Sequence, residues 1–436
     1  MTAGLWRPAP YQDSYLQERP QRRAVRTGTS HTRMDLRRQP DSSTWRAART
    51  MPSRLPPTEV PGSGDERAAF DPGDNELGQP ADVHEDSDRQ GAGDGTRRRL
   101  LRAKGQHETK GQIVVNTQTA QPAGSPVIEY LAVLPTAQRR ELLDLAREVT
   151  ARCEDWLRVY PIVLRPSVTA ACSLISTVAL PGAGTAELRL LTCWWLWIFG
   201  VDDVFDDPAA DDSQIACWAG RFASDPPIDP ADDDPLRAAL GSIHDALSRY
   251  PLFARLASQW RTGMAEIVSG MLTERQWSVS TPPTFPAYLA NGMATIAVRP
   301  YTLTACVLAG ERGAAAAFET LDPVINAAAR CFRLANDLRS YSRERQEGKL
   351  NALTVLGAEY SARGLRDNQA LRAARRRLYD TCVADLEYLD RARRAAPPAI
   401  ATLAGFLWAH TAFVWDMYHV GDYDTVSTLL REGGIS

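Results

Sequence analysis

The chain has 436 residues, of which 44% are hydrophobic and 24% are charged. This length allows one large domain or two ordinary ones. The formal net charge of −3 predicts no strong general attraction to nucleic acid.

Seven cysteines are scattered along the chain and none forms a CxxC pair. Several of them, such as Cys193 and Cys331, fall in apolar helical patterns and are interpreted as buried thiols, which favours a reducing, cytoplasmic location. The uncharged apolar run Leu190 to Val201 is too short to cross a bilayer. The first residues lack the apolar core of a secretory signal, so we expect no membrane span and no export.

Residues 1–125 differ in composition from the rest of the chain. They are rich in Arg, Asp, Gly, Pro and Ser, with few aliphatic residues; 65–94 are mostly acidic and 97–104 are basic. Such a segment buries too little apolar surface to offset its conformational entropy, so it is predicted to be a disordered extension. A dispensable extension, or a start codon placed too far upstream, is favoured over a docking or membrane-surface tail.

Residues 126–436 show helical periodicity with short connections and no alternating strand pattern. This predicts an all-α fold, a single helical bundle. The main helices are expected over 186–206, 211–222, 235–249, 252–272, 285–308 (interrupted at Gly292 and Pro300), 321–344, 365–395 and 400–420.

An apolar helix pattern that begins at Cys193 ends in four carboxylates before Pro208. Asp202 and Asp206 share one helix face, with Asp203 beside them. The proline places them in the last turn, where the negative end of the helix dipole makes acids unfavourable without a compensating cation. A bound hard divalent metal would compensate them. A solvated acidic helix end is the alternative, and this stretch alone does not decide between them.

A second stretch supplies oxygen ligands on a later helix. Asn336, Ser340 and Glu344 follow one another at intervals of four residues and lie along one stripe. An amide oxygen, a hydroxyl and a carboxylate are ligands that Mg²⁺ accepts. The same helix carries Arg343, one of three arginines whose forked guanidinium groups suit phosphate. Surface ion pairing is the alternative interpretation.

With both stretches, the sequence resembles the class I terpene synthases, and most closely the bacterial diterpene synthases. Asp202-Asp203-Val204-Phe205-Asp206 fits their DDxxD motif, and Asn336 to Glu344 fits their (N/D)D(L/I/V)x(S/T)xxxE motif at every fixed position. The resemblance implies the α-domain fold of that family. It also implies three Mg²⁺ ions, for which Mn²⁺ can substitute, that join the two motifs and hold a substrate diphosphate. Asp202, Asp206, Asn336, Ser340 and Glu344 would be the catalytic set, with Asp203 a further metal ligand.

The diphosphate contacts depart from the family pattern. The position of the usual sensor arginine, 46 residues before Asn336, holds Ala290, and we expect Arg299 to replace it. The Arg-Tyr pair of the family's C-terminus reads Asp422-Tyr423, so only Tyr423 is expected to persist. Arg343 matches the family's basic residue directly before the glutamate and is expected to contact diphosphate.

The apolar wall of a substrate pocket is predicted from aromatic side chains. Trp195 and Phe199 lie seven residues before Asp202 and Asp206, so they fall on the same helix face two turns deeper. Aromatic faces stabilise cations without attacking them. The segment 288–300 resembles a pocket wall of the bacterial enzymes, which adds Thr295 and Ile296. Trp408 and Trp415 would line another wall; ordinary core packing is the alternative for all these aromatics.

These features predict an enzyme, a carbon–oxygen lyase that ionises a prenyl diphosphate and cyclises the carbocation. The sensor-less segment 288–300 favours a C20 substrate, either geranylgeranyl diphosphate or a bicyclic labdane-type diphosphate. A sesquiterpene cyclase acting on a C15 diphosphate is an alternative, and a non-catalytic helical scaffold with solvated acids is another. A chain-elongating prenyltransferase is disfavoured by the Asn336/Ser340/Glu344 motif. The resemblance also suggests pairing into a homodimer.

Overall fold

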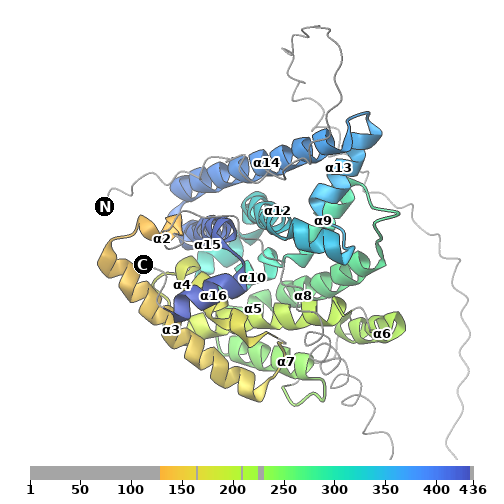
Figure 1. Ribbon diagram of the computed structural model, residues 1–436. Coiled ribbons are helices and arrows are strands. Elements are labelled where there is room, and N and C mark those ends of the chain that lie inside the picture. Colours follow the sequence, from red (N-terminus) through yellow and green to blue (C-terminus); the bar gives the residue numbers. More distant parts are fainter. Residues whose placement is uncertain (1–127, 164, 208–209, 224–229, 433–436) are drawn as a thin grey trace, which may run out of the picture. The chain divides into compact units, whose positions relative to one another are not determined.

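The computed structural model describes residues 128–432, except 164, 208–209 and 224–229. This part of the chain is built from helices and contains no strand, which confirms the all-α prediction (Figure 1). The predicted disorder of residues 1–125 lies outside the described residues.

The helices agree in position with the expected ones, usually within two or three residues at each end. The helix that carries the aspartates is α5 (Thr185–Phe205), and the helix that carries Asn336 is α12 (Asp322–Glu347). The remaining elements are α2 (Glu129–Ala132), α3 (Thr136–Val159), η5 (Pro166–Val168), α4 (Thr169–Ala179), α6 (Asp212–Ala223), α7 (Pro235–Ser248), α8 (Phe253–Gln276), α9 (Phe285–Thr295), α10 (Val298–Ala309), α11 (Arg312–Ala316), η6 (Phe318–Leu321), α13 (Ala352–Ala362), α14 (Asp367–Ala395), η7 (Pro398–Ile400), α15 (Ala401–Val420) and α16 (Tyr423–Arg431).

Helix α5 lies in the interior because it is apolar around most of its circumference. Trp194 and Trp197 on it are fully buried, and the Trp197 indole nitrogen donates to the Leu236 carbonyl of α7 at 2.8 Å. Helix α12 packs between α14, α15 and α9. Figure 1 shows α12 and α15 side by side with α14 across them. The two helices that carry the predicted motifs are therefore both inner elements of one bundle.

The predicted interruption of the helix over 285–308 is real but lies elsewhere. Helix α9 ends at Thr295 and α10 begins at Val298, and between them Ala297 adopts a left-handed conformation with φ 64°. Gly292 is inside α9, and Pro300 is in the first turn of α10, where its missing N–H costs no helical hydrogen bond. The prediction that Gly292 and Pro300 form the kink is therefore wrong.

Helix α16 after the last predicted helix was not expected. Gly421 has an extended backbone that ends α15. The Asp422 carboxylate then accepts from the Thr425 backbone N–H at 3.0 Å and so caps the N-terminus of α16. This short amphipathic helix brings Tyr423 and Asp424 back toward the middle of the bundle.

Two described stretches are long and apolar enough to cross a membrane, namely Phe285–Ala309 and Pro398–Val420. Their apolar windows are 72% and 61% buried inside the bundle, as expected for core helices of a folded domain.

Candidate active site

The two predicted sets of oxygen ligands, one on α5 and one on α12, face one cavity. Its volume is about 740 Å³, and its lining includes Asp202 and Asp206 from α5 and Asn336, Ser340 and Glu344 from α12. These two helices bring together side chains that are more than 130 residues apart in the sequence. The assumption on which the sequence interpretation depended, that the two stripes share a hollow, is thus satisfied.

The acidic end of α5 is compensated in part by protein cations. Lys349, in the turn after α12, places its ammonium 2.7 Å from Asp206 and 3.2 Å from Glu347. One side of Asp202 lines the cavity, and the protein around its other sides partly removes the carboxylate from water. That desolvation, together with the nearby charges of Asp206 and Asp203, raises the pKa of Asp202 to about 8. Asp203 does not line the cavity.

Each oxygen-bearing residue of α12 is held by a neighbour. The Asn336 amide nitrogen donates to the Tyr418 hydroxyl at 2.9 Å, which leaves the amide oxygen for a cation. The Ser340 hydroxyl donates to the Asn336 carbonyl at 2.8 Å. Glu344 accepts from the Asn351 amide at 2.8 Å. Partners of this kind orient metal ligands before the metal arrives.

Asn351 is a positioning residue that sequence reasoning missed. It is fully buried, and its amide group also donates to the Asp337 carbonyl at 2.8 Å. Its own oxygen accepts from the Leu353 backbone N–H at 2.9 Å and so caps α13. An asparagine directly before a helical stretch indicates an N-cap, so the sequence could have shown that role of Asn351. Nothing in the sequence links Asn351 to Glu344.

We predict that Asn351→Asp weakens Mg²⁺-dependent diphosphate binding by about 10–100-fold, the usual loss when a metal ligand loses its orienting partner. Aspartate keeps the cap acceptor and removes the amide that donates to Glu344 and to the Asp337 carbonyl, so the loss separates orientation of the ligands from capping. The measurement is the Mg²⁺ titration of the thermal shift produced by inorganic diphosphate, with the exposed Asn368→Ala on α14 as control. Equal titrations for Asn351→Asp and the unchanged protein would contradict this role.

Arg333 lies at the centre of a buried polar network beneath the stripes and was also missed. Its guanidinium donates to Glu274 of α8 at 3.0 Å, to Asp337 at 3.3 Å and to the Tyr288 hydroxyl. It also donates to the Thr295 hydroxyl at 3.1 Å, at the end of α9. Burial opposes the charge, but the carboxylates of Asp337 and Glu274 hold the pKa of Arg333 well above its usual value.

The carboxyl of Asp337 is the most deeply buried acid of this network. Burial raises its pKa to about 7, against the opposing pull of Arg333 and with further upward pressure from Glu344. Tyr288 donates to it at 3.1 Å. The network therefore ties α12 to α8, α9 and the break before α10, and one arginine supplies the positive charge for two acids.

Gly292 is required at its position because Arg333 passes beside it. A Cβ there would lie 2.9 Å from the Arg333 Nε and 3.0 Å from its Cγ. No sequence signal could distinguish this from the predicted kink, because both explain a glycine inside an apolar helix.

We predict that Gly292→Ala lowers the free energy of unfolding by about 1–3 kcal/mol through overpacking, although alanine favours helix. Diphosphate binding should weaken with it, because Arg333 is displaced from its acceptors. Gly357→Ala on α13, where a Cβ meets nothing within 4 Å, is the matched control and should be neutral or stabilising. Urea denaturation and diphosphate titration of both variants check this; equal behaviour would contradict it.

Cationic side chains surround the mouth of the cavity. Arg343 and Tyr423 line it as predicted, together with Arg165, Arg339 and Lys349. Arg165 is held by Asp424 at 3.1 Å, which is why the unexpected helix α16 matters for the mouth. Arg299 does not line the cavity. It pairs with Asp322 at 2.7 Å and lies over the Phe318 ring, so the prediction that it replaces the sensor arginine is corrected.

The inner end of the cavity is apolar and aromatic. Trp195, Phe199, Thr295 and Ile296 line it as predicted, and Phe332 joins them. Phe332 packs edge-on to Trp195, with ring centroids 5.6 Å apart.

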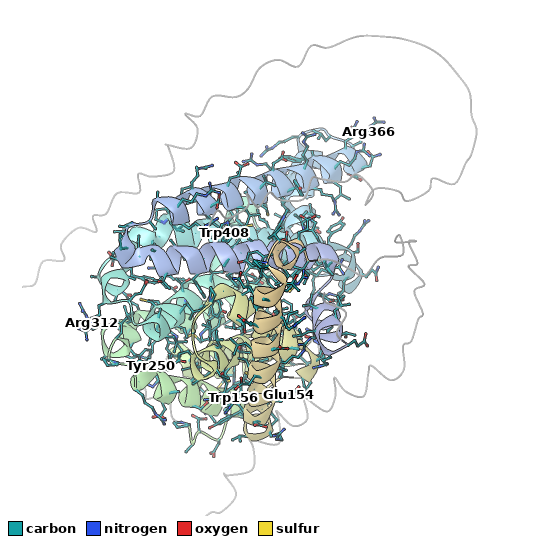
Figure 2. All side chains as sticks on the ribbon, turned by 90° about the vertical axis from the view of Figure 1, so that its left-hand side faces the viewer. Glu154, Trp156, Tyr250, Arg312, Arg366 and Trp408 are labelled. Atoms are coloured by element: carbon teal, nitrogen blue, oxygen red, sulfur yellow. The ribbon has the colours of Figure 1, made fainter. Side chains whose placement is uncertain are left out.

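Trp408 and Trp415 do not line the cavity, which corrects the prediction for that wall. Trp408, labelled in Figure 2, lies on α15 with the Arg393 guanidinium of α14 3.8 Å from its ring centroid. Trp415 packs against the Tyr379 ring of α14 in a tilted arrangement and edge-on against His419. Both residues face the α14 side of their helix, so core packing, the alternative interpretation, describes them.

The donor set fits a hard divalent cation. Carboxylate, amide and hydroxyl oxygens are the ligands such ions prefer. Among the described residues, no three His, Cys, Asp or Glu side chains come together closely enough to hold an ion by themselves. The set would therefore need the oxygens of Asn336 and Ser340, and those of a bound anion, to complete a coordination shell.

Comparison with known proteins agrees with this geometry. Residues 193–383 match the family described as terpene synthase family 2, C-terminal metal binding. An ent-beyerene synthase of Oryza sativa subsp. japonica is 28% identical over 162 residues, which are 36% of this chain and 19% of that protein. An ent-pimara-9(11),15-diene synthase of Streptomyces sp. (strain KO-3988) is 27% identical over 226 residues, which are 48% of this chain and 73% of that protein.

The fold also has solved counterparts. Isoprene synthase from Populus x canescens, in complex with three Mg²⁺ ions and dimethylallyl-S-thiolodiphosphate, superposes with a TM-score of 0.53 at 12% identity, covering 67% of this chain and 59% of that one. At this identity the likeness concerns the fold alone. Taken with the matched family and the relatives, the two motif-bearing helices around one cavity identify residues 193–383 as the metal-binding region of a class I terpene synthase.

Proposed function

We propose that this protein is an Mg²⁺-dependent terpene cyclase that ionises a C20 prenyl diphosphate, releases diphosphate and converts the carbocation to a diterpene. In enzyme terms it is a carbon–oxygen lyase acting on phosphates. The observation that carries the proposal is one cavity lined both by oxygen ligands and cations and by aromatic and apolar side chains. An allylic diphosphate needs both, because its head is charged and its chain is apolar.

Charge neutralisation at the mouth drives the first step. Bound Mg²⁺ ions would supply most of it, held by Asp202 and Asp206 on one side and by Asn336, Ser340 and Glu344 on the other. Arg343, Arg165 and Lys349 add positive charge to the oxygens of the leaving group. The allylic carbon–oxygen bond breaks and its electron pair leaves with the diphosphate, so no proton is needed.

The inner end then handles the carbocation. The ring faces of Trp195, Phe199 and Phe332 stabilise it electrostatically and expel water. A proton lost at the end of the cascade is taken by the released diphosphate. His410 behind this wall is fully buried, and burial lowers its pKa to about 3. It does not line the cavity, so we assign it no step.

The C20 substrate is supported by the names of the relatives, since ent-beyerene and ent-pimaradiene are diterpenes. The matched segments are partial, and the chain spans only 19% of the rice protein. The cavity volume of about 740 Å³ lies within the range of about 300–1,000 Å³ usual for small-molecule sites. That volume accommodates a C15 or a C20 chain, so a sesquiterpene cyclase is the second candidate.

Three Mg²⁺ ions are proposed by analogy with the isoprene synthase complex whose description names three. Mn²⁺ should substitute, because it accepts the same oxygen ligands. A cytoplasmic location and a homodimer are the accompanying proposals.

A panel assay tests the proposal. Purified protein and Mg²⁺ are incubated with C10, C15, C20 and bicyclic C20 diphosphates, and products are identified by gas chromatography and mass spectrometry. We expect a cyclic diterpene from one of the C20 substrates and no product after chelation of Mg²⁺. A product from the C15 substrate alone would select the sesquiterpene cyclase. Failure to bind inorganic diphosphate in the presence of Mg²⁺ would leave the non-catalytic scaffold.

A further inference from the structure

Arg275, near the end of α8, connects three segments beside the cavity. Its Nη1 donates to the Phe205 carbonyl at 2.7 Å and to the Asp207 carbonyl at 3.0 Å. Its Nη2 donates to the Ala210 carbonyl at 2.7 Å, and its Nε donates to the Asp212 carboxylate at 2.7 Å. One side chain thus holds the last residue of α5, the chain that follows it and the first residue of α6.

One of these acceptors, the Phe205 carbonyl, lies at the end of α5, where the helix needs a donor. The last carbonyls of a helix have no partner within the helix and carry its negative dipole end. The final turn of α5 also carries Asp202 and Asp206, so dipole and carboxylates repel each other. The Arg275 side chain is only 17% exposed, so its charge is weakly screened here. Figure 1 shows α6 beyond this end of α5 and α8.

The contacts demand the planar fork of arginine. Three backbone carbonyls lie in different directions, and each accepts from a separate N–H group of the rigid, planar guanidinium. The Asp212 carboxylate accepts from the fourth. A lysine ammonium carries three donors at one point and reaches fewer of these oxygens. Arg275 itself borders the cavity but pairs inward with backbone, unlike Arg343 at the mouth.

We propose that Arg275 is a positioning residue for the metal site: it fixes the last turn of α5 so that Asp202 and Asp206 present their carboxylates to a shared cation. This rests on the proposed function of the cavity as a site for Mg²⁺ and diphosphate. The guanidinium bonds of Arg275 go to backbone carbonyls and to Asp212, so it acts through the backbone that carries the acids.

The test compares Arg275→Lys, Arg275→Met and Arg255→Met in the full chain. Arg255 is an exposed arginine on the same helix and serves as the matched control. Isothermal titration measures Mg²⁺ affinity in the presence of inorganic diphosphate, and circular dichroism and melting temperature report the fold. We expect Arg275→Lys to keep the helical spectrum and to lose about 10–100-fold in Mg²⁺ affinity. Arg255→Met should match the unchanged protein.

A second readout separates positioning from stability alone. If Arg275 positions the acids, raised Mg²⁺ restores turnover of Arg275→Lys, so the loss is in the Mg²⁺ dependence while turnover at saturating Mg²⁺ is retained. The gain in melting temperature from Mg²⁺ and diphosphate also shrinks. A variant with unchanged Mg²⁺ affinity, or with a melting temperature lowered equally with and without the ligands, overturns the inference. If Arg275→Met does not fold, the lysine variant decides. If the unchanged protein binds no Mg²⁺ with diphosphate, the proposed function itself fails.

Discussion

Replacing Asp202 with alanine should abolish product formation while the helical circular dichroism spectrum stays intact. Asp202 lines the cavity, and burial, together with the charges of Asp206 and Asp203, raises its pKa to about 8. Part of that shift comes from crowded negative charge, so removing one carboxylate relieves repulsion and should not destabilise the fold. The same clustered carboxylates would bind a divalent cation, and without that cation the charge of the leaving group is not neutralised.

The measurement is turnover of the best substrate from the panel, together with the melting temperature with and without Mg²⁺ and diphosphate. Asp245→Ala is the control, because Asp245 forms a surface pair with Arg249 of the same region, away from the cavity lining. It should retain full activity. An Asp202→Ala protein that still turns over at a comparable rate would remove Asp202 from the metal site.

Arg333→Met should cause the largest loss of stability of any single change near the cavity, about 3–5 kcal/mol in the free energy of unfolding. Asp337 would remain as a buried acid and Glu274 as a partly buried one, with their shared cation removed, and the Tyr288 and Thr295 hydroxyls would each lose a partner. Activity should fall with stability, because Asp337 lies within the second motif. Chemical denaturation at constant pH measures the effect.

A double substitution provides the control for this prediction. Adding Glu274→Gln to Arg333→Met removes one of the two surplus charges, so part of the lost stability should return. In the unchanged background, Glu274→Gln should be destabilising, since Arg333 then loses an ionic partner. Stability within about 1 kcal/mol of the unchanged protein for Arg333→Met would mean that the network contributes little.

The sequence was sufficient for the features that depend on periodicity. Helix spacing alone places Asp202 beside Asp206, and Asn336 in line with Ser340 and Glu344, whatever the rest of the fold does. Trp195 and Phe199 were found for the same reason, two turns along the same face of α5. The helical bundle and most helix ends follow from apolar patterning and from Pro and Gly.

What was missed depends on contacts between distant segments. Arg333 and Arg299 are similar in sequence terms, and only packing shows that Arg333 turns inward to Glu274 while Arg299 pairs with Asp322. Trp408 and Trp415 have helical spacing that suits a pocket or a core equally well. The break at Ala297 has no glycine or proline at the left-handed residue, so no local signal marks it.

The Lys349–Asp206 ion pair sets an order of arrival under the proposed function. A free magnesium ion that approaches Asp202 and Asp206 must displace the Lys349 ammonium from Asp206. Magnesium that arrives already complexed to diphosphate offers the displaced lysine phosphate oxygens in exchange. Free magnesium by itself would then compete with Lys349 for Asp206, whereas the substrate would bring its own magnesium and bind the lysine it displaces.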